Sequence, residues 1–289
     1  MATVSEWIEG ARPRTLPNAI APVVAGVGAA IALDAFSWWR SLLALFVALS
    51  LIIGVNFAND YSDGVRGTDE NRVGPLRLVG SGTAAPKAVL RAALGCLGLA
   101  GVLGLALVVL TGHWWLLVMG ALCILGAWFY TGGKKPYGYY GFGEIAVFVF
   151  FGLAAVLGTA YVQAGRVSWA ALGCAVAVGC FSMGVLTANN LRDIPTDLES
   201  GKRTLATRLG DQGTRRMYLT LVAVPYVVSV LLGIWHPLVL ITLITAPMLL
   251  KSVKAVGGGQ HGRALIPALR DTGLAMLAWA VLSAVALSF

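Results

Sequence analysis

Long apolar runs alternate with polar connections along the whole chain. Each run approaches the roughly 20 residues that a helix needs to cross the hydrocarbon core of a bilayer. Lys251 and Lys254 extend the short eighth run by reaching their ammonium groups to the interface. The pattern predicts one polytopic all-α membrane domain over residues 1–289, with nine spans at 16–33, 41–58, 88–110, 114–130, 143–163, 167–188, 217–234, 237–250 and 272–288.

Charge placement predicts the orientation of these spans. If the N-terminus is cytoplasmic, all of the 21 lysines and arginines except Arg40 and Arg166 lie in or beside the cytoplasmic connections. Short cytoplasmic loops accumulate Lys and Arg, so we expect a multi-pass protein of the inner (cytoplasmic) membrane with its N-terminus inside. Of the 13 Asp and Glu residues, only Asp34 falls outside, which predicts an active site that faces the cytoplasm.

The composition excludes a soluble fold and explains the charge. Only 12% of the residues are charged and 58% are hydrophobic, whereas soluble domains have about 25% charged residues. The net charge of +8 follows from the basic inner loops, so no nucleic-acid partner is expected. The lipid bilayer is the partner that this composition requires.

Two inner segments are rich in Asp and Asn at helical spacing. In the second segment, Asn189, Asp193 and Asp197 recur every four residues, so they lie on one helical face with neighbours about 6 Å apart. The first segment places Asn59 and Asp63 on one face and adds Asp60 and Asp69. Facing each other, the two segments would form a cup lined with carboxylates.

Such a cup implies bound cations, because unpaired carboxylates at a membrane boundary repel one another. Oxygen ligands without His or Cys favour Mg²⁺, whose coordination is usually completed by water and substrate phosphate. The basic residues interleaved with the cup suit a diphosphate, and they are Arg66, Arg72, Arg77, Arg192, Lys202 and Arg203. Arg12 and Arg14, just before the first span, are further candidates for phosphate contact, although positive-inside anchoring also explains them.

The connection that begins at Tyr130 gathers tyrosines, lysines and glycines and ends at Glu144. Aromatic rings beside lysines suit an aromatic carboxylate, which makes Tyr130, Lys135, Tyr137 and Glu144 candidate acceptor-binding residues. The tyrosines also fit an interfacial belt, and single Asp residues in loops are often only solvated charges. Two Asp motifs at matching helix ends favour the site over that simpler interpretation.

The motifs resemble those of the UbiA-type superfamily of intramembrane aromatic prenyltransferases. Asn59, Asp60 and Asp63 match its first motif, and Asp193 and Asp197 match its second. Gly67 stands where the family often has a last Asp, and Asp69 is the nearest acid. The strings ARPRTLP, NDYSDGVRGTD, YTGGKKPYGYYGFGE, NNLRDIPTDLESGKRTL and LIPALRDTG are most similar to the menaquinone branch, and they cover almost the whole chain.

The resemblance implies a bundle of nine helices around a central cavity that opens to the cytoplasmic side and laterally to lipid. It also implies Mg²⁺-dependent transfer of a polyprenyl group from polyprenyl diphosphate to 1,4-dihydroxy-2-naphthoate, with release of diphosphate and CO₂ to give demethylmenaquinol. Arg66 and Lys202 are then expected to stabilise the departing diphosphate, and Asp69 is the candidate base.

Three questions stay open at the level of the sequence. Another aromatic acceptor, such as 4-hydroxybenzoate, is the alternative within the superfamily, and a membrane transporter is the alternative outside it. No acid sits in the middle of a predicted span, which disfavours transport. The oligomeric state is also open, a homo-oligomer included.

Overall fold

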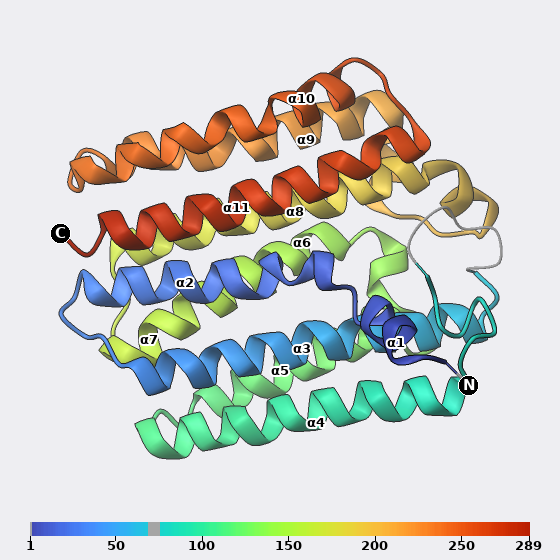
Figure 1. Cartoon of the computed structure of the whole chain (residues 1–289), viewed down its shortest axis with the longest axis horizontal. Helices are drawn as coiled ribbons and strands as arrows, with labels where there is room; N and C mark the ends of the chain where they lie inside the picture. Colours follow the sequence, from blue (N-terminus) through green and yellow to red (C-terminus); the bar gives the residue numbers. More distant parts are fainter. Residues whose placement is uncertain (1, 69–75) are drawn as a thin grey trace.

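The chain folds into a bundle of helices that lie along one common axis, with the two termini at opposite ends (Figure 1). The computed structural model describes residues 2–68 and 76–289, and over these residues it contains helices and connections but no strand. The elements are α1 Val4–Gly10, η1 Pro13–Thr15, α2 Pro17–Ile31, α3 Trp38–Val65, α4 Pro86–Thr111, α5 Leu116–Phe129, η2 Tyr137–Tyr140, α6 Gly143–Val147, η3 Phe148–Leu157, α7 Gly158–Ala164, α8 Trp169–Glu199, α9 Leu205–Leu232, η4 Pro237–Leu249, α10 Leu250–Gly257, η5 Gly262–Leu265 and α11 Ile266–Ala286.

Each predicted span has an apolar helix in the structure. Among the described residues, 7 helical runs are long and apolar enough to cross a membrane. The pair Val4–Thr15 and Pro17–Ile31, bent by 47°, supplies a further span, and α5 is a shorter apolar helix of 14 residues. The prediction of an all-α membrane protein is confirmed.

Two helices continue past their predicted spans into the Asp-rich segments. The spans expected at 41–58 and 167–188 belong to α3 and α8, which continue to Val65 and Glu199. Hydropathy marks where a helix leaves the lipid, but backbone hydrogen bonding can continue into the polar segment that follows. Both Asp-rich segments therefore begin inside helices, and the connections after them are shorter than the polar runs predict.

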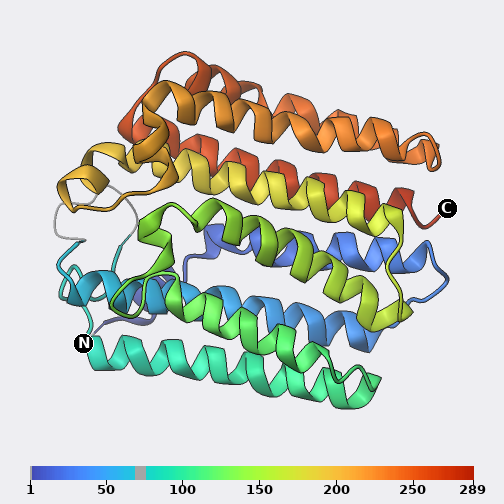
Figure 2. The ribbon, with the colours of Figure 1, turned by 180° about the vertical axis from the view of Figure 1, so that it is seen from behind.

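The long and short connections lie at opposite ends of the bundle (Figures 1 and 2). The end with the short connections, which the charge pattern predicts to face outward, has tight turns, two of which use glycines with positive φ at Gly112 and Gly165. There Arg40 donates hydrogen bonds to the carbonyls of Val162 and Gln163 at 3.0 and 3.1 Å. A cation at the C-terminal end of α7 is favourable for the helix dipole, and Arg40 thereby joins α3 to α7.

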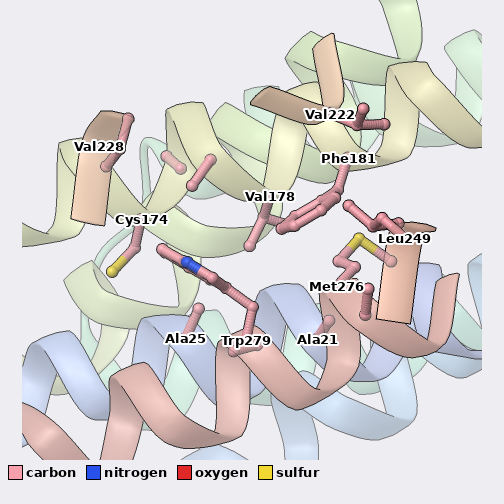
Figure 3. Close-up of a cluster of buried hydrophobic side chains, with 14 of the residues drawn as sticks. Ala21, Ala25, Cys174, Val178, Phe181, Val222, Val228, Leu249, Met276 and Trp279 are labelled. Atoms are coloured by element: carbon pink, nitrogen blue, oxygen red, sulfur yellow. The ribbon is translucent and has the colours of Figure 1, made fainter. Parts of the chain in front are cut away.

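The main hydrophobic core lies between α2, α8, α9 and α11 (Figure 3). Trp279 and Phe181 are fully buried there, with their rings edge to face at 6.3 Å. The indole N–H of Trp279 donates to Ser229 Oγ at 2.9 Å, which satisfies its polar atom inside the bundle. α8 is thus held rigidly on one side, and its other face is available to line a site.

Helices α2 and α11 approach each other closely at Gly28. A Cβ at this position would lie 2.3 Å from the Cα of Ala284, a distance that requires the two backbones to separate. Gly98 in α4 provides a matched control, because a Cβ there meets nothing within 4 Å.

We predict that Gly28→Ala lowers the stability of the purified protein by about 1–3 kcal/mol, the usual effect of overpacking. Gly98→Ala should leave stability unchanged or raise it by about 0.5–1 kcal/mol, since alanine is the better helix former. Unfolding in detergent, followed by circular dichroism, measures both. Equal stability of the two variants would contradict the close approach.

Candidate active site

A cavity of about 820 Å³ lies between α2, α3, α4, α5, α8 and the run from α6 to α7. Its outer part is apolar, with walls that include Val23, Leu107, Val108 and Val162. Its inner part is polar and receives the ends of α3 and α8 that carry the two Asp motifs. The cavity therefore combines a hydrocarbon-like compartment with a charged one.

On α3, Asn59 and Asp63 line the polar end, one helical turn apart. Asn59 Oδ1 accepts a hydrogen bond from Thr131 Oγ1 at 2.7 Å. Asp63 accepts from the guanidinium of Arg77, with Nη2 and Oδ2 3.3 Å apart, and from the hydroxyl of Tyr139. Both side chains are buried and are oriented by neighbours from other segments.

On α8, Asn189, Asp193 and Asp197 line the same polar end. Arg192 donates to both carboxylate oxygens of Asp193, at 2.6 and 2.7 Å, and to Asn189 Oδ1 at 2.9 Å. The carbonyl of Asp197 accepts from the backbone N–H of Lys202 at 2.8 Å. The two Asp motifs therefore meet at one cavity, as the helical spacing predicts.

Asp60 lies elsewhere, although the sequence predicts it as a metal ligand. Its two oxygens accept from the backbone N–H groups of Leu78 and Val79 at 2.8 and 3.0 Å, and the side chain does not line the cavity. Adjacent residues point about 100° apart around a helix, so Asp60 and Asn59 face different neighbours. Asp60 fixes the segment after the first motif to α3.

The predicted basic residues separate into two groups. Arg12, Arg77 and Lys202 line the cavity. Arg14 and Arg203 are exposed outside it, and Arg66 donates to the carbonyls of Thr131 and Gly133. Asp69 and Arg72 lie outside the described residues. In this conformation Arg66 joins two loops, whereas Arg12, Arg77 and Lys202 face the site.

The candidate acceptor residues also divide. Tyr130 and Tyr137 line the cavity with their rings edge to face at 5.6 Å, and the Tyr137 hydroxyl donates to the carbonyl of Gly126 at 2.7 Å. Lys135 is exposed and does not line the cavity. Glu144 is fully buried behind the wall.

Glu144 acts on the cavity wall through Asn190. Its Oε1 accepts a hydrogen bond from Asn190 Nδ2 at 2.8 Å, and Asn190 itself lines the cavity. A buried carboxyl group that holds an amide in this way fixes which of the amide's atoms faces the space beyond it. Asn190, rather than Glu144, is the group that a bound molecule meets.

Sequence reasoning did not assign Asn190, Thr131 or Tyr139 to the site. Helical periodicity gives no signal for Asn190, since it is adjacent to Asn189 and points in another direction. Thr131 and Tyr139 lie in the tyrosine-rich connection, where spacing along the chain does not determine which side chain turns inward. Burial and the nearby Asp63 carboxylate raise the pKa of Tyr139 well above its usual value, so its hydroxyl remains a donor.

The residues at the polar end fit a Mg²⁺ ion that arrives with a diphosphate. Among the described residues, no three carboxylate, His or Cys side chains are grouped as a complete metal site. The available donors are carboxylate and amide oxygens, and three cations line the same end of the cavity. This is the donor set that suits Mg²⁺ completed by water and phosphate oxygens.

Comparison with known proteins gives a consistent result. The model of the UbiA prenyltransferase family matches residues 19–263. The chain is 59% identical to the 1,4-dihydroxy-2-naphthoate octaprenyltransferase of Mycobacterium tuberculosis, over 100% of this chain and 99% of that protein. It is 38% identical to the enzyme of the same name from Escherichia coli, over 92% of this chain and 89% of that protein.

Solved structures share the fold at low identity. A UbiA homologue from Aeropyrum pernix superposes with a TM-score of 0.69 at 15% identity, covering 93% of this chain and 96% of that one. A UbiA homologue from Archaeoglobus fulgidus bound to DMAPP and Mg²⁺ gives a TM-score of 0.68 at 14% identity, covering 98% and 99%. These likenesses support the helical architecture.

The hydrogen bonds of Asp60 generate a prediction about stability. In Asp60→Asn, one oxygen is replaced by an amide NH₂, which cannot accept from the backbone N–H groups of Leu78 and Val79. Leaving a buried donor unsatisfied costs about 1–3 kcal/mol.

We therefore expect Asp60→Asn to lower the unfolding midpoint and to speed hydrogen exchange at the Leu78 and Val79 amides. Asp34→Asn is the control, because Asp34 is exposed in an outer turn with φ 57°, a conformation that Asn also adopts. Wild-type exchange at Leu78 and Val79 in Asp60→Asn would refute the assigned role.

Proposed function

The chain belongs to the UbiA prenyltransferase family, and on this premise we propose that it transfers a polyprenyl group to 1,4-dihydroxy-2-naphthoate in menaquinone biosynthesis. The donor is a polyprenyl diphosphate. The observation that carries the proposal is a single cavity that joins both Asp motifs and three cations at one end to an apolar compartment at the other. A long isoprenoid diphosphate has the same division between charged head and hydrocarbon tail.

The diphosphate head fits the polar end. Asp63, Asp193 and Asp197 would hold Mg²⁺, with Asn59 and Asn189 as further oxygen donors. When bound, Mg²⁺ supplies Lewis-acid stabilisation of the negative charge on the diphosphate. Arg12, Arg77 and Lys202 contribute fixed positive charge at the same end, where it favours departure of the diphosphate with the electron pair of the broken C–O bond.

The tail fits the apolar part of the cavity and the lipid beyond it. Each buried methylene contributes about 0.8 kcal/mol. Binding the tail therefore anchors the donor while the polar residues orient its reactive carbon. This separation of tasks explains why the site belongs in a membrane-embedded bundle.

The acceptor side is assigned to Tyr130, Tyr137 and Asn190, which line the cavity beside the Asp motifs. Aromatic edges suit a naphthalene ring, and the Asn190 amide offers a hydrogen bond to a ring hydroxyl or carboxylate. The allylic carbon bonds to the electron-rich ring, and the ring loses its carboxylate as CO₂. If the new bond forms at the carboxylate-bearing carbon, loss of CO₂ replaces loss of a proton. A base such as Asp69 is then required only for bonding at another carbon.

The orientation follows from charge. The polar end of the cavity and the long connections lie at the same end of the bundle, which also carries nearly all the basic residues. We infer that the protein spans the inner membrane with this end on the cytoplasmic side. The water-soluble acceptor then reaches the polar end directly, and the donor enters from the bilayer.

The function is tested with the purified full chain in detergent or liposomes, given Mg²⁺, a long polyprenyl diphosphate and 1,4-dihydroxy-2-naphthoate. Mass spectrometry should detect the prenylated, decarboxylated product, and EDTA should abolish its formation. Supplying 4-hydroxybenzoate in a parallel reaction tests the alternative acceptor. Turnover of the benzoate in place of the naphthoate would overturn the assignment, as would ion flux in liposomes without any prenylated product.

The cavity carboxylates generate a prediction about turnover. Asp63→Ala and Asp193→Ala each remove an oxygen donor from the polar end, and stabilisation by a metal ion amounts to several kcal/mol. We expect each variant to lose at least about 100-fold in kcat/KM for the donor, since 1.36 kcal/mol corresponds to a factor of ten. Asp34→Ala makes the same change at the outer end and should retain full turnover. Near-normal rates in either cavity variant would remove that residue from the assigned set.

A further inference from the structure

Tyr139 connects three polar segments that are far apart in the sequence. It lies in η2, within the connection between α5 and α6, and it lines the cavity. Its side chain contacts the end of α3 and the loop after α8, and its carbonyl accepts from the backbone N–H of Arg203 at 2.9 Å.

The first contact is with a proposed metal ligand. The Tyr139 hydroxyl donates to Asp63 Oδ1, and Thr68 Oγ1 lies 3.5 Å from the same hydroxyl. Arg77 approaches the other carboxylate oxygen, Oδ2. The Tyr139 hydroxyl therefore binds one oxygen of Asp63 and the Arg77 guanidinium binds the other, and together these contacts fix the plane of the carboxylate.

The second contact is with a proposed diphosphate-binding cation. The ammonium of Lys202 lies 4.6 Å from the centre of the Tyr139 ring, within the range of a cation–π interaction. The Arg66 guanidinium lies 5.5 Å from the same ring. One side chain therefore fixes an acidic group through its hydroxyl and a basic group through its ring.

We propose that Tyr139 is a positioning residue that sets the separation between the Asp63 carboxylate and the Lys202 ammonium, and so matches the site to a metal-bound diphosphate. This inference rests on the proposed function. Groups that orient a metal ligand typically change metal affinity or activity 10–100-fold when they are removed. The ring contact adds an independent effect on the diphosphate.

Substitutions separate the two contacts. Tyr139→Phe removes the hydroxyl from Asp63 and keeps the ring under Lys202, whereas Tyr139→Leu removes both. Tyr140→Phe is the control: this neighbouring tyrosine is 46% exposed and does not line the cavity.

Metal binding is measured without turnover, by titrating the full chain in detergent with Mn²⁺ in the presence of inorganic diphosphate and following the free ion by electron paramagnetic resonance. Tyr139→Phe should weaken Mn²⁺ binding about 10–100-fold. Tyr140→Phe should bind like the wild type. Wild-type affinity in Tyr139→Phe would overturn the role of the hydroxyl.

The ring contact is measured by steady-state kinetics at saturating Mg²⁺. Tyr139→Leu should raise the KM for the polyprenyl diphosphate about threefold to thirtyfold above that of Tyr139→Phe, the range that corresponds to a cation–π contact. Equal KM values for the two variants would overturn the role of the ring. If the wild-type protein transfers no prenyl group, the proposed function fails, whereas wild-type turnover with an unaffected Tyr139→Phe removes only this inference.

Discussion

Burying charge at the edge of a membrane is the constraint on which the polar end of this bundle depends. A carboxylate withdrawn from water is stable only when hydrogen-bond donors and cations surround it. Asp193 has Arg192, Asp63 has Arg77 and Tyr139, and Asp60 has two backbone N–H groups. Arg192 adjoins Asp193 on α8, whereas the partners of Asp63 and Asp60 come from other segments, so satisfying these two charges also holds the segments together. The polar interactions that make a site possible are the same ones that hold the polar end of the bundle together.

The helix α8 connects the hydrophobic core to the site, because it packs in the core on one face and carries site residues on another. One face packs against α9 and α11 around Phe181 and Trp279, and another presents Asn189, Asp193 and Asp197 to the cavity. Rigid packing on one side means that the acidic residues need little reorganisation to meet a bound ion. Preorganised charge of this kind is the largest contribution that a protein usually makes to stabilising a leaving group.

The sequence predicted those features that follow from hydropathy and helical spacing. Hydropathy predicted the apolar spans and the all-α architecture. Helical spacing predicted which faces of α3 and α8 carry Asp63, Asp193 and Asp197 to the cavity. Asp60, Glu144, Arg66 and Lys135 show where such reasoning ends, because whether a side chain reaches the cavity depends on contacts between segments distant in sequence. Asn190 shows the converse: it reaches the cavity from a helix position that the four-residue pattern omits. The role of Asp69, outside the described residues, stays a prediction.

The wall that α4 and α5 contribute to the cavity has open space beside two of its glycines. In α5, Ala127 is the single buried residue, and in α4 and α5 an added Cβ at Gly104 or Gly120 meets nothing within 4 Å, although both glycines line the cavity. This side of the cavity can therefore accept larger side chains without disturbing the core of α8, α9 and α11. Larger side chains at these two positions would shorten the hydrocarbon compartment and so limit the length of isoprenoid that it accepts, without touching the buried charges at the polar end.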